Sequence, residues 1–298
     1  MALAQALFGV SGILVTPFDD SGEIAPLRLD PIINRAISAG VHILTVNGNT
    51  GEFYGLSTSE AVTMVQVVCK LVDGRVPIVA GVGRALPDAI ALTRASVAAG
   101  TDALMIHQPP DPFVAPRGVC DYIRTIRDAA EDVPLILYLR NDRVGLDAIS
   151  QMCSIEGVIG VKWATPNPMV LKSAIEAAPD HVTWVGGLAE VWAPSFYAVG
   201  ARGFTSGLIN VWPEHSVAIN LALEAGDIDR ARALIATMQV FEDIRAAEQG
   251  GANVSGVKCA LAMLGNDCGA ARPPAAWPLS DDQQEQLKNF MIKNGLIS

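Results

Sequence analysis

The chain has 298 residues, half of them hydrophobic, and carries a formal net charge of −10 at neutral pH. No run of basic residues interrupts this acidity, which excludes the electrostatic footprint of a nucleic-acid-binding protein. No apolar stretch reaches the roughly 18 residues that a membrane-spanning helix needs, and the N-terminal residues lack the basic start of a secretory signal. We therefore expect a cytoplasmic protein that does not insert into a membrane.

Short apolar runs recur along the chain, separated by alanine-rich segments with helical spacing. Eight runs are predicted strands, at 12–16, 42–46, 77–82, 103–106, 134–138, 158–162, 182–185 and 203–205. Helices are predicted between them at 27–39, 57–72, 87–99, 117–130 and 169–177. Glycines after small residues, at positions 40, 100 and 200, indicate helix ends. Eight strands alternating with helices predict an α/β protein with a closed (β/α)8 TIM barrel rather than an open sheet.

The strand pattern stops after about residue 213. The remaining segments have helical spacing, at 216–225, 228–249, 254–264 and 279–294. These helices have no strands to pair with, so we expect a C-terminal helical extension that packs against the barrel or a neighbouring subunit. The predicted division is 1–213 for the barrel with the active site and 214–298 for the C-terminal helical region.

Lys162 lies in the apolar stretch 157–164, which otherwise has the composition of a buried parallel strand. A desolvated amine loses affinity for its proton, and the free amine can attack a carbonyl to form a Schiff base. The alternative interpretation is a lysine whose amine extends from the strand end to water. The residues at the other strand ends bear on this choice.

Barrel enzymes carry their chemistry at the C-terminal ends of the strands. The glycine-flanked loop Asn49-Thr50-Gly51 follows the second predicted strand and can point backbone N–H groups at a carboxylate, although such loops are also ordinary turns. Tyr138 ends the strand that precedes the strand of Lys162. Its phenol can therefore exchange a proton with the amine or with an adduct of the amine.

The cofactor motifs are incomplete. The five cysteines and four histidines are scattered, without Cys-x-x-Cys or other metal-ligand spacing. Gly81-Val82-Gly83 lacks the third glycine of a dinucleotide fingerprint, because Leu86 occupies that position. We expect reduced thiols, no structural metal and no dinucleotide bound at this turn.

The polar residues together form a pattern. Thr16-Pro17-Phe18, Gly48-Asn49-Thr50-Gly51-Glu52, Tyr138, Arg143 with Gly145, and Gly160-Val161-Lys162 resemble the dihydrodipicolinate synthase / N-acetylneuraminate lyase family over essentially the whole chain. The resemblance implies a barrel with C-terminal helices, usually a homotetramer, without a metal or organic cofactor. It also implies a lyase in which Lys162 forms a Schiff base with pyruvate or a related 2-oxo acid. The reaction would be an aldol-type condensation or cleavage, or a dehydration.

The resemblance also implies roles for individual residues. Tyr138 would transfer protons, Thr50 would orient Tyr138 by a hydrogen bond, and the backbone of Asn49 and Thr50 would hold the substrate carboxylate. Arg143 would meet a substrate carboxylate at the pocket mouth. The other predicted substrate-binding residues are Gly51, Gly186, Gly187, Thr205, Ser206 and Gly207, and possible pocket residues are Thr16, His107 and Arg140.

The sequence also departs from the family pattern. Asn49 stands where synthases usually carry a second threonine, and 107–113 contains no tyrosine for the neighbouring subunit. Stretch 186–189 lacks the acidic residue of sialic acid lyases. Both departures leave the physiological substrate open.

Two alternatives remain. A decarboxylating dehydratase of a deoxy-oxo sugar acid is one, because 50–53, 138–140, 254–258 and 272–274 are similar to 5-dehydro-4-deoxyglucarate dehydratases. A non-catalytic 2-oxo acid binding protein is the other.

Overall fold

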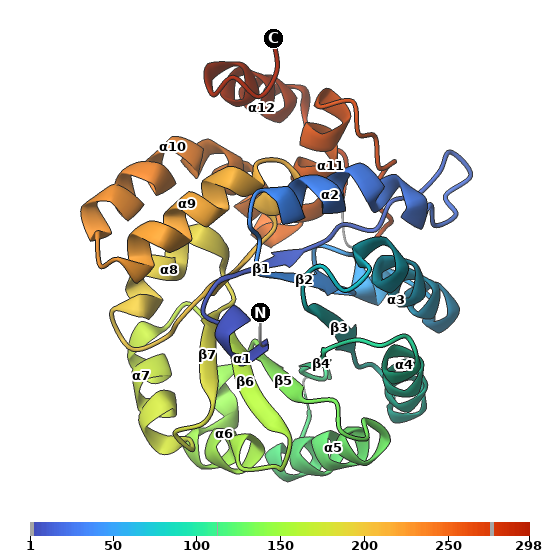
Figure 1. Cartoon of the computed structure of the whole chain (residues 1–298), viewed down its shortest axis with the longest axis vertical. Helices are drawn as coiled ribbons and strands as arrows, with labels where there is room; N and C mark the ends of the chain where they lie inside the picture. Colours follow the sequence, from blue (N-terminus) through green and yellow to red (C-terminus); the bar gives the residue numbers. More distant parts are fainter. Residues whose placement is uncertain (1–2, 112, 275–276) are drawn as a thin grey trace.

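The computed structural model describes residues 3–111, 113–274 and 277–298, and its centre is a closed barrel of eight parallel strands (Figure 1). The strands follow sequence order around the barrel, and β1 closes it by pairing with β8. They are β1 (Val10–Ile13), β2 (Ile43–Val46), β3 (Ile78–Val82), β4 (Ala103–His107), β5 (Leu135–Leu139), β6 (Val158–Trp163), β7 (Thr183–Gly186) and β8 (Phe204–Ser206). The predicted (β/α)8 barrel is confirmed.

Helices surround the strands and continue beyond them. The α-helices are α1 (Leu3–Ala6), α2 (Asp30–Ser38), α3 (Thr58–Val72), α4 (Leu86–Ala98), α5 (Pro116–Ala129), α6 (Leu146–Cys153), α7 (Pro168–Ala177), α8 (Ala189–Tyr197), α9 (Pro213–Glu224), α10 (Ile228–Ala246), α11 (Asn253–Met263) and α12 (Asp281–Lys293). Gly40, Gly100 and Gly200 have φ of 89°, 82° and 112°, the left-handed conformation predicted for helix ends. The spacing did not predict α1, α6 or α8.

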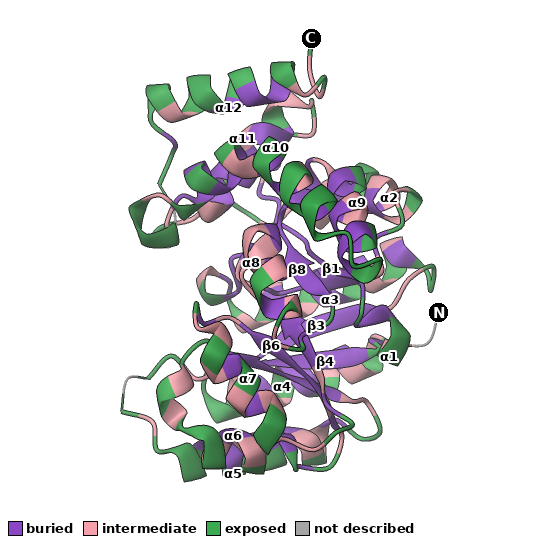
Figure 2. Cartoon of the chain, turned by 90° about the vertical axis from the view of Figure 1, so that its left-hand side faces the viewer, coloured by how far each residue is buried: buried purple, intermediate pink, exposed green. Residues whose placement is uncertain are grey.

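Apolar side chains fill the barrel and the layer between strands and helices. The purple strands of Figure 2 lie inside a partly exposed helical layer. Within the barrel, Ile43, Val79, Met105, Ile136 and Val185 form one buried cluster with Ala6 and Leu7 next to α1. Tyr138 belongs to the same cluster. The barrel is therefore a packed core, and its chemistry is confined to one end.

The strand register places three predicted site residues at one level. Lys162 of β6 pairs with Tyr138 of β5, and Tyr138 pairs with His107 of β4. The predicted first strand is displaced, because β1 ends at Ile13 and Thr16 lies in the connection that follows it. The carboxyl ends of these strands share one rim of the barrel, where the candidate site lies.

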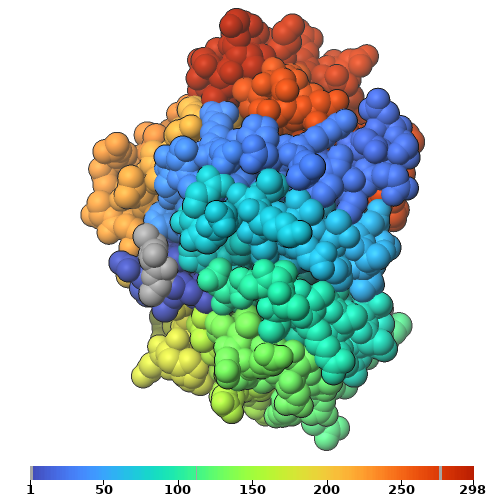
Figure 3. Space-filling model, turned by 45° about the vertical axis from the view of Figure 1, so that its right-hand side comes forward, coloured from blue at the N-terminus to red at the C-terminus, as the bar shows by residue number. Residues whose placement is uncertain are grey.

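The last part of the chain, which contains α12, forms the red block at the top of Figure 3, whereas α9 and α10 lie at the side of the barrel next to α8 (Figure 1). After β8 the described residues contain no further strand. The boundary between the barrel and the C-terminal helical region at residue 213 stays a prediction. Helices α10 and α11, which follow this boundary, line the same cavity as the strand ends. In the described part of the chain, no helix is both long and apolar enough to cross a membrane.

Candidate active site

A cavity of about 560 Å³ opens at the carboxyl end of the barrel. Eight of the site residues predicted from the sequence line it: Asn49, Thr50, Tyr138, Arg140, Lys162, Gly187, Thr205 and Gly207. The cavity therefore brings together eight residues that lie far apart in the sequence. Thr16, Gly51, His107, Arg143, Gly186 and Ser206 do not line it.

Lys162 brings an amine with a lowered pKa to the cavity wall. The side chain is buried, and its Nζ lies 4.0 Å from the centre of the Tyr138 ring. Burial lowers the pKa of Lys162 to about 7, and Arg140 adds a smaller effect in the same direction. No carboxylate opposes this shift among the groups that determine it. A large fraction of the amine is therefore unprotonated at neutral pH.

Tyr138 presents its phenol beside this amine. Asn49 donates a hydrogen bond from Nδ2 to the Tyr138 hydroxyl oxygen at 3.0 Å. Burial raises the pKa of Tyr138 to about 12, so the phenol keeps its proton at neutral pH. Because the hydroxyl oxygen accepts from Asn49, its own proton stays free for transfer. The hydrogen bond expected from Thr50 is thus made by Asn49, whose longer amide side chain reaches the phenol.

Asn49 and Thr50, in the loop after β2, both line the cavity. Gly51 and Glu52 donate their N–H groups within the loop, to Gly48 and Asn49. In the described residues no hydrogen bond uses the amides of Asn49 or Thr50. These two N–H groups are available to an anion, as the glycine-flanked loop predicts.

The loop has little freedom to move. Thr16 donates its hydroxyl to the Gly51 carbonyl at 2.6 Å. A Cβ on Gly48 would lie 2.5 Å from Ile13, and a Cβ on Gly51 would lie 2.9 Å from the Leu14 carbonyl oxygen. Thr16 is therefore a support of the loop, and the two glycines permit the close approach of β1.

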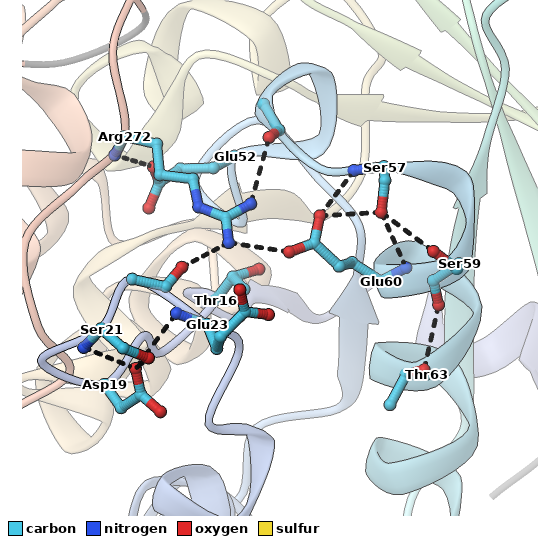
Figure 4. A network of polar contacts seen from close by, with 12 residues as sticks. Thr16, Asp19, Ser21, Glu23, Glu52, Ser57, Ser59, Glu60, Thr63 and Arg272 are labelled. Atoms are coloured by element: carbon cyan, nitrogen blue, oxygen red, sulfur yellow. Dashed lines mark hydrogen bonds and ion pairs between the residues drawn. The ribbon is translucent and has the colours of Figure 1, made fainter.

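The C-terminal region fixes the same loop through Glu52. One carboxylate oxygen of Glu52 lies 2.7 Å from Lys258 Nζ, and both side chains are buried. The other oxygen accepts the backbone N–H of Arg272 at 2.7 Å. The Arg272 guanidinium also contacts Glu60 and the Gly55 carbonyl (Figure 4). Residues 258 and 272, predicted only as signs of a dehydratase-like sequence, thus anchor the loop that carries Asn49 and Thr50.

Two arginines follow β5, and only one lines the cavity. Arg140 lies on the cavity wall with its guanidinium 6.0 Å from the centre of the Tyr138 ring. Arg143 is exposed on the short 3-10 turn Asp142–Val144 and does not line the cavity. The guanidinium expected at the pocket mouth is therefore available from Arg140 rather than from Arg143.

His107 lies beside Tyr138 on the neighbouring strand and does not line the cavity. Its ring stacks on Phe53 at 4.3 Å between ring centres, and Nε2 lies 2.9 Å from the Asn47 carbonyl oxygen. Burial lowers the pKa of His107 to about 3, so the imidazole is neutral. The imidazole packs edge to face against the Tyr138 ring, with 5.3 Å between ring centres, and therefore supports the position of Tyr138.

Residues of α10 and α11 complete the cavity, and sequence reasoning missed them. They are Gln239, Glu242, Asp243, Arg245, Ala246 and Asn253, with Gln249 and Gly250 between the helices. The remaining wall is formed by Ile13, Ala164, Leu188, Ala189, Val191 and Trp192. Charged residues on a helix usually face water, so their spacing gave no signal of a binding site.

The described residues contain no group of three or more His, Cys, Asp or Glu side chains that could hold a metal ion. The chemistry that the cavity itself can perform is attack by an amine on a carbonyl, with proton transfer by a phenol and binding of a carboxylate by backbone amides. These groups are typical of (β/α)8 barrel enzymes that react through a Schiff base.

Comparison with known proteins identifies the family within this class. The model of the dihydrodipicolinate synthetase family matches residues 6–294. The 4-hydroxy-tetrahydrodipicolinate synthase of Methanopyrus kandleri is 30% identical over 97% of each chain. A probable 5-dehydro-4-deoxyglucarate dehydratase of Bacillus subtilis is 28% identical over 97% of this chain and 94% of its own. The crystal structure of dihydrodipicolinate synthase from Bacillus clausii superposes with a TM-score of 0.94 and 34% identity, covering 98% and 99% of the two chains.

The chain belongs to the dihydrodipicolinate synthetase family. Its resemblance to this family and its assignment to the lyases are confirmed. Members of the family act on small molecules, which agrees with the open cavity at the barrel rim.

Proposed function

We propose that the protein is a lyase in which Lys162 forms a Schiff base with pyruvate or a related 2-oxo acid. The observation that carries this proposal is the buried Lys162 amine, 4.0 Å from the Tyr138 ring centre in a cavity at the strand ends. The amine attacks C2 of the 2-oxo acid, and the carbonyl oxygen leaves as water. The resulting protonated imine withdraws electrons and makes the adjacent carbon acidic.

The neighbouring groups support the other steps. The free amides of Asn49 and Thr50 bind the carboxylate of the 2-oxo acid. Tyr138 keeps a transferable proton at neutral pH and lies beside the amine, which suits it to move protons to and from the adduct. Arg140 is placed to meet further negative charge on the substrate.

Reductive trapping tests the proposal. Borohydride added with pyruvate should convert the imine into a stable adduct that increases the intact mass of the protein. Lys162→Met should abolish the adduct, whereas Lys172→Met should retain it, because Lys172 is an exposed lysine of α7 paired with Glu176. An adduct that persists in Lys162→Met would contradict the assignment.

A dehydratase of a deoxy-oxo sugar acid is the second candidate. It is supported by the 28% identity to the probable 5-dehydro-4-deoxyglucarate dehydratase and by the polar wall that α10 and α11 add to the cavity. Release of CO₂ from 5-dehydro-4-deoxyglucarate favours this candidate. Condensation of pyruvate with aspartate semialdehyde favours a synthase. Assembly as a homo-oligomer and a cytoplasmic location remain proposals from the sequence.

A further inference from the structure

Tyr138 has to give up its proton in a buried place. In the proposed reaction the phenol protonates the hydroxyl group that leaves C2 as water, and the phenolate then takes a proton from the adjacent carbon. A buried phenolate is costly unless a donor contacts its oxygen. Burial raises the pKa of Tyr138 to about 12, so the phenolate is rare at neutral pH. A group that stabilises the phenolate would therefore accelerate the proton transfers.

Asn49 donates a hydrogen bond to this oxygen. The distance from Nδ2 to the Tyr138 hydroxyl oxygen is 3.0 Å, and the Asn49 side chain makes no other hydrogen bond within the described ranges. The side-chain oxygen of Asn49 is buried and has no hydrogen-bond partner there. The hydrogen bonding of this side chain within the protein is thus directed at Tyr138 alone.

The other polar neighbours of Tyr138 lie over or beside its ring. Lys162 Nζ lies 4.0 Å from the ring centre, the Arg140 guanidinium lies 6.0 Å from it, and the neutral imidazole of His107 packs edge to face. Arg140 and Asn49 both oppose the effect of burial on the pKa of Tyr138. Because the nitrogen of an amide side chain donates but does not accept, Asn49 stabilises the phenolate without competing for the proton of the phenol.

A similar contact occurs away from the cavity. Asn220 donates from Nδ2 to the Tyr197 hydroxyl oxygen at 3.1 Å, and the Gly203 backbone N–H donates to the same oxygen at 2.7 Å. Neither Asn220 nor Tyr197 lines the cavity. An amide that donates to a phenol is therefore not a sign of chemistry by itself. The pair on the cavity wall differs because its phenol lies beside the amine of Lys162.

We propose that Asn49 is a positioning residue whose side-chain amide stabilises the phenolate of Tyr138 while the phenol proton is on the substrate. The inference rests on the proposed function. It gives the Asn49 side chain a role in proton transfer that is separate from carboxylate binding by the backbone N–H. A purely structural contact would fix the ring without changing how readily the phenol gives up its proton.

Deuterium exchange into the methyl group of pyruvate tests this role in the full chain. Exchange in D₂O, followed by NMR, requires an imine at Lys162 and removal of a proton from the adjacent carbon, but no second substrate. Asn49→Leu removes the donor with little change in volume and should slow exchange by about 10- to 100-fold, the effect of losing one hydrogen bond to a charged group. The final amount of pyruvate adduct trapped by borohydride should be the same as in the wild type.

A more acidic phenol distinguishes stabilisation of the phenolate from placement of the ring. A fluorinated tyrosine at position 138 should restore most of the exchange rate that Asn49→Leu loses. The reason is that a base whose pKa lies closer to the working pH is more often in its reactive form. A ring displaced by the substitution would stay displaced, and its exchange rate would not recover.

The controls separate the possible outcomes. Asn220→Ala removes the similar contact at Tyr197 and should leave exchange unchanged. If Asn49→Leu does not fold, Asn49→Ala also removes the donor. Unchanged exchange in a folded Asn49 variant, an equal loss in Asn220→Ala, or no recovery with the fluorinated phenol would overturn the role of Asn49. Absence of a trapped adduct in the wild-type protein would instead overturn the proposed function.

Discussion

The two buried lysines of this protein differ mainly in whether a carboxylate lies beside the amine. Lys162 Nζ lies 4.0 Å from the Tyr138 ring centre, and Lys258 Nζ lies 4.2 Å from the Phe18 ring centre. Both side chains are 5% exposed or less. Lys258 has Glu52 at 2.7 Å, whereas no carboxylate counteracts the effect of burial on Lys162.

This difference separates a structural lysine from a reactive one. Burial lowers the pKa of both amines, but Glu52 opposes the shift at Lys258 and favours its charged form. The charged Lys258 holds the loop of Asn49 and Thr50 in place. The amine of Lys162 is free to act as a nucleophile. A buried lysine alone therefore does not indicate an imine site. The charges beside the amine decide whether it stays protonated or can react.

The largest expected effect is the loss of Lys162. Lys162→Met removes the only nucleophile of the proposed reaction, so turnover of a 2-oxo acid substrate should fall by several orders of magnitude. Steady-state kinetics and thermal unfolding measured together would distinguish this effect from misfolding. A folded variant that keeps more than a few percent of the wild-type rate would contradict the assignment of Lys162 as the reactive lysine.

The proton-transfer role of Tyr138 gives the next effect. Tyr138→Phe keeps the ring beside Lys162 but removes the transferable proton, so kcat should fall by about 10²- to 10⁴-fold. The pyruvate adduct at Lys162 should still be trapped by borohydride, because the amine remains buried. An unchanged kcat would show that another group transfers the proton.

Lys258 should affect stability rather than chemistry. Lys258→Met leaves Glu52 buried without its ion-pair partner and should lower the free energy of unfolding by about 3–5 kcal/mol. Lys258→Met combined with Glu52→Gln removes the unpaired charge and should recover much of this loss. Denaturant unfolding of the three proteins measures both values. A single variant as stable as the wild type would mean that the pair does not anchor the loop.

The smallest expected effect is the pH dependence of reductive trapping at Lys162. The pKa of Lys162 is lowered to about 7 from the ordinary value of 10.5, and the unprotonated amine is the reactive form. The rate of adduct formation should therefore rise with pH and reach half its maximum near pH 7. Below that pH it should fall about tenfold per unit. A midpoint near the ordinary lysine value would show that Lys162 is not desolvated in solution.

Much of the fold was predictable because each buried strand is a short apolar run. Seven of the eight strands lie within one residue of their predicted bounds. The exception is β1, which begins two residues and ends three residues before its predicted bounds, because apolar residues continue past the strand end at Ile13. Lys162 was predictable because a charge interrupts such a run. Tyr138 was predictable because neighbouring parallel strands end at the same rim.

The contacts between distant loops and helices were not predictable in the same way. The hydrogen bond from Asn49 to Tyr138 depends on the course of a loop, which no periodicity describes. Glu242 and Arg245 have the spacing of ordinary surface charges on a helix, and only the packing of α10 over the rim buries them. The placement of Arg140 rather than Arg143 on the cavity wall depends on the turn after β5.

Peptide mapping of the wild-type protein, treated with pyruvate and borohydride at pH 7, tests the central claim most directly. Lys162 and Lys258 can be quantified in the same digest, so each lysine is the control for the other. The account predicts the reduced adduct on Lys162 and an unmodified Lys258. No adduct on Lys162, or equal modification of the two lysines, would contradict it.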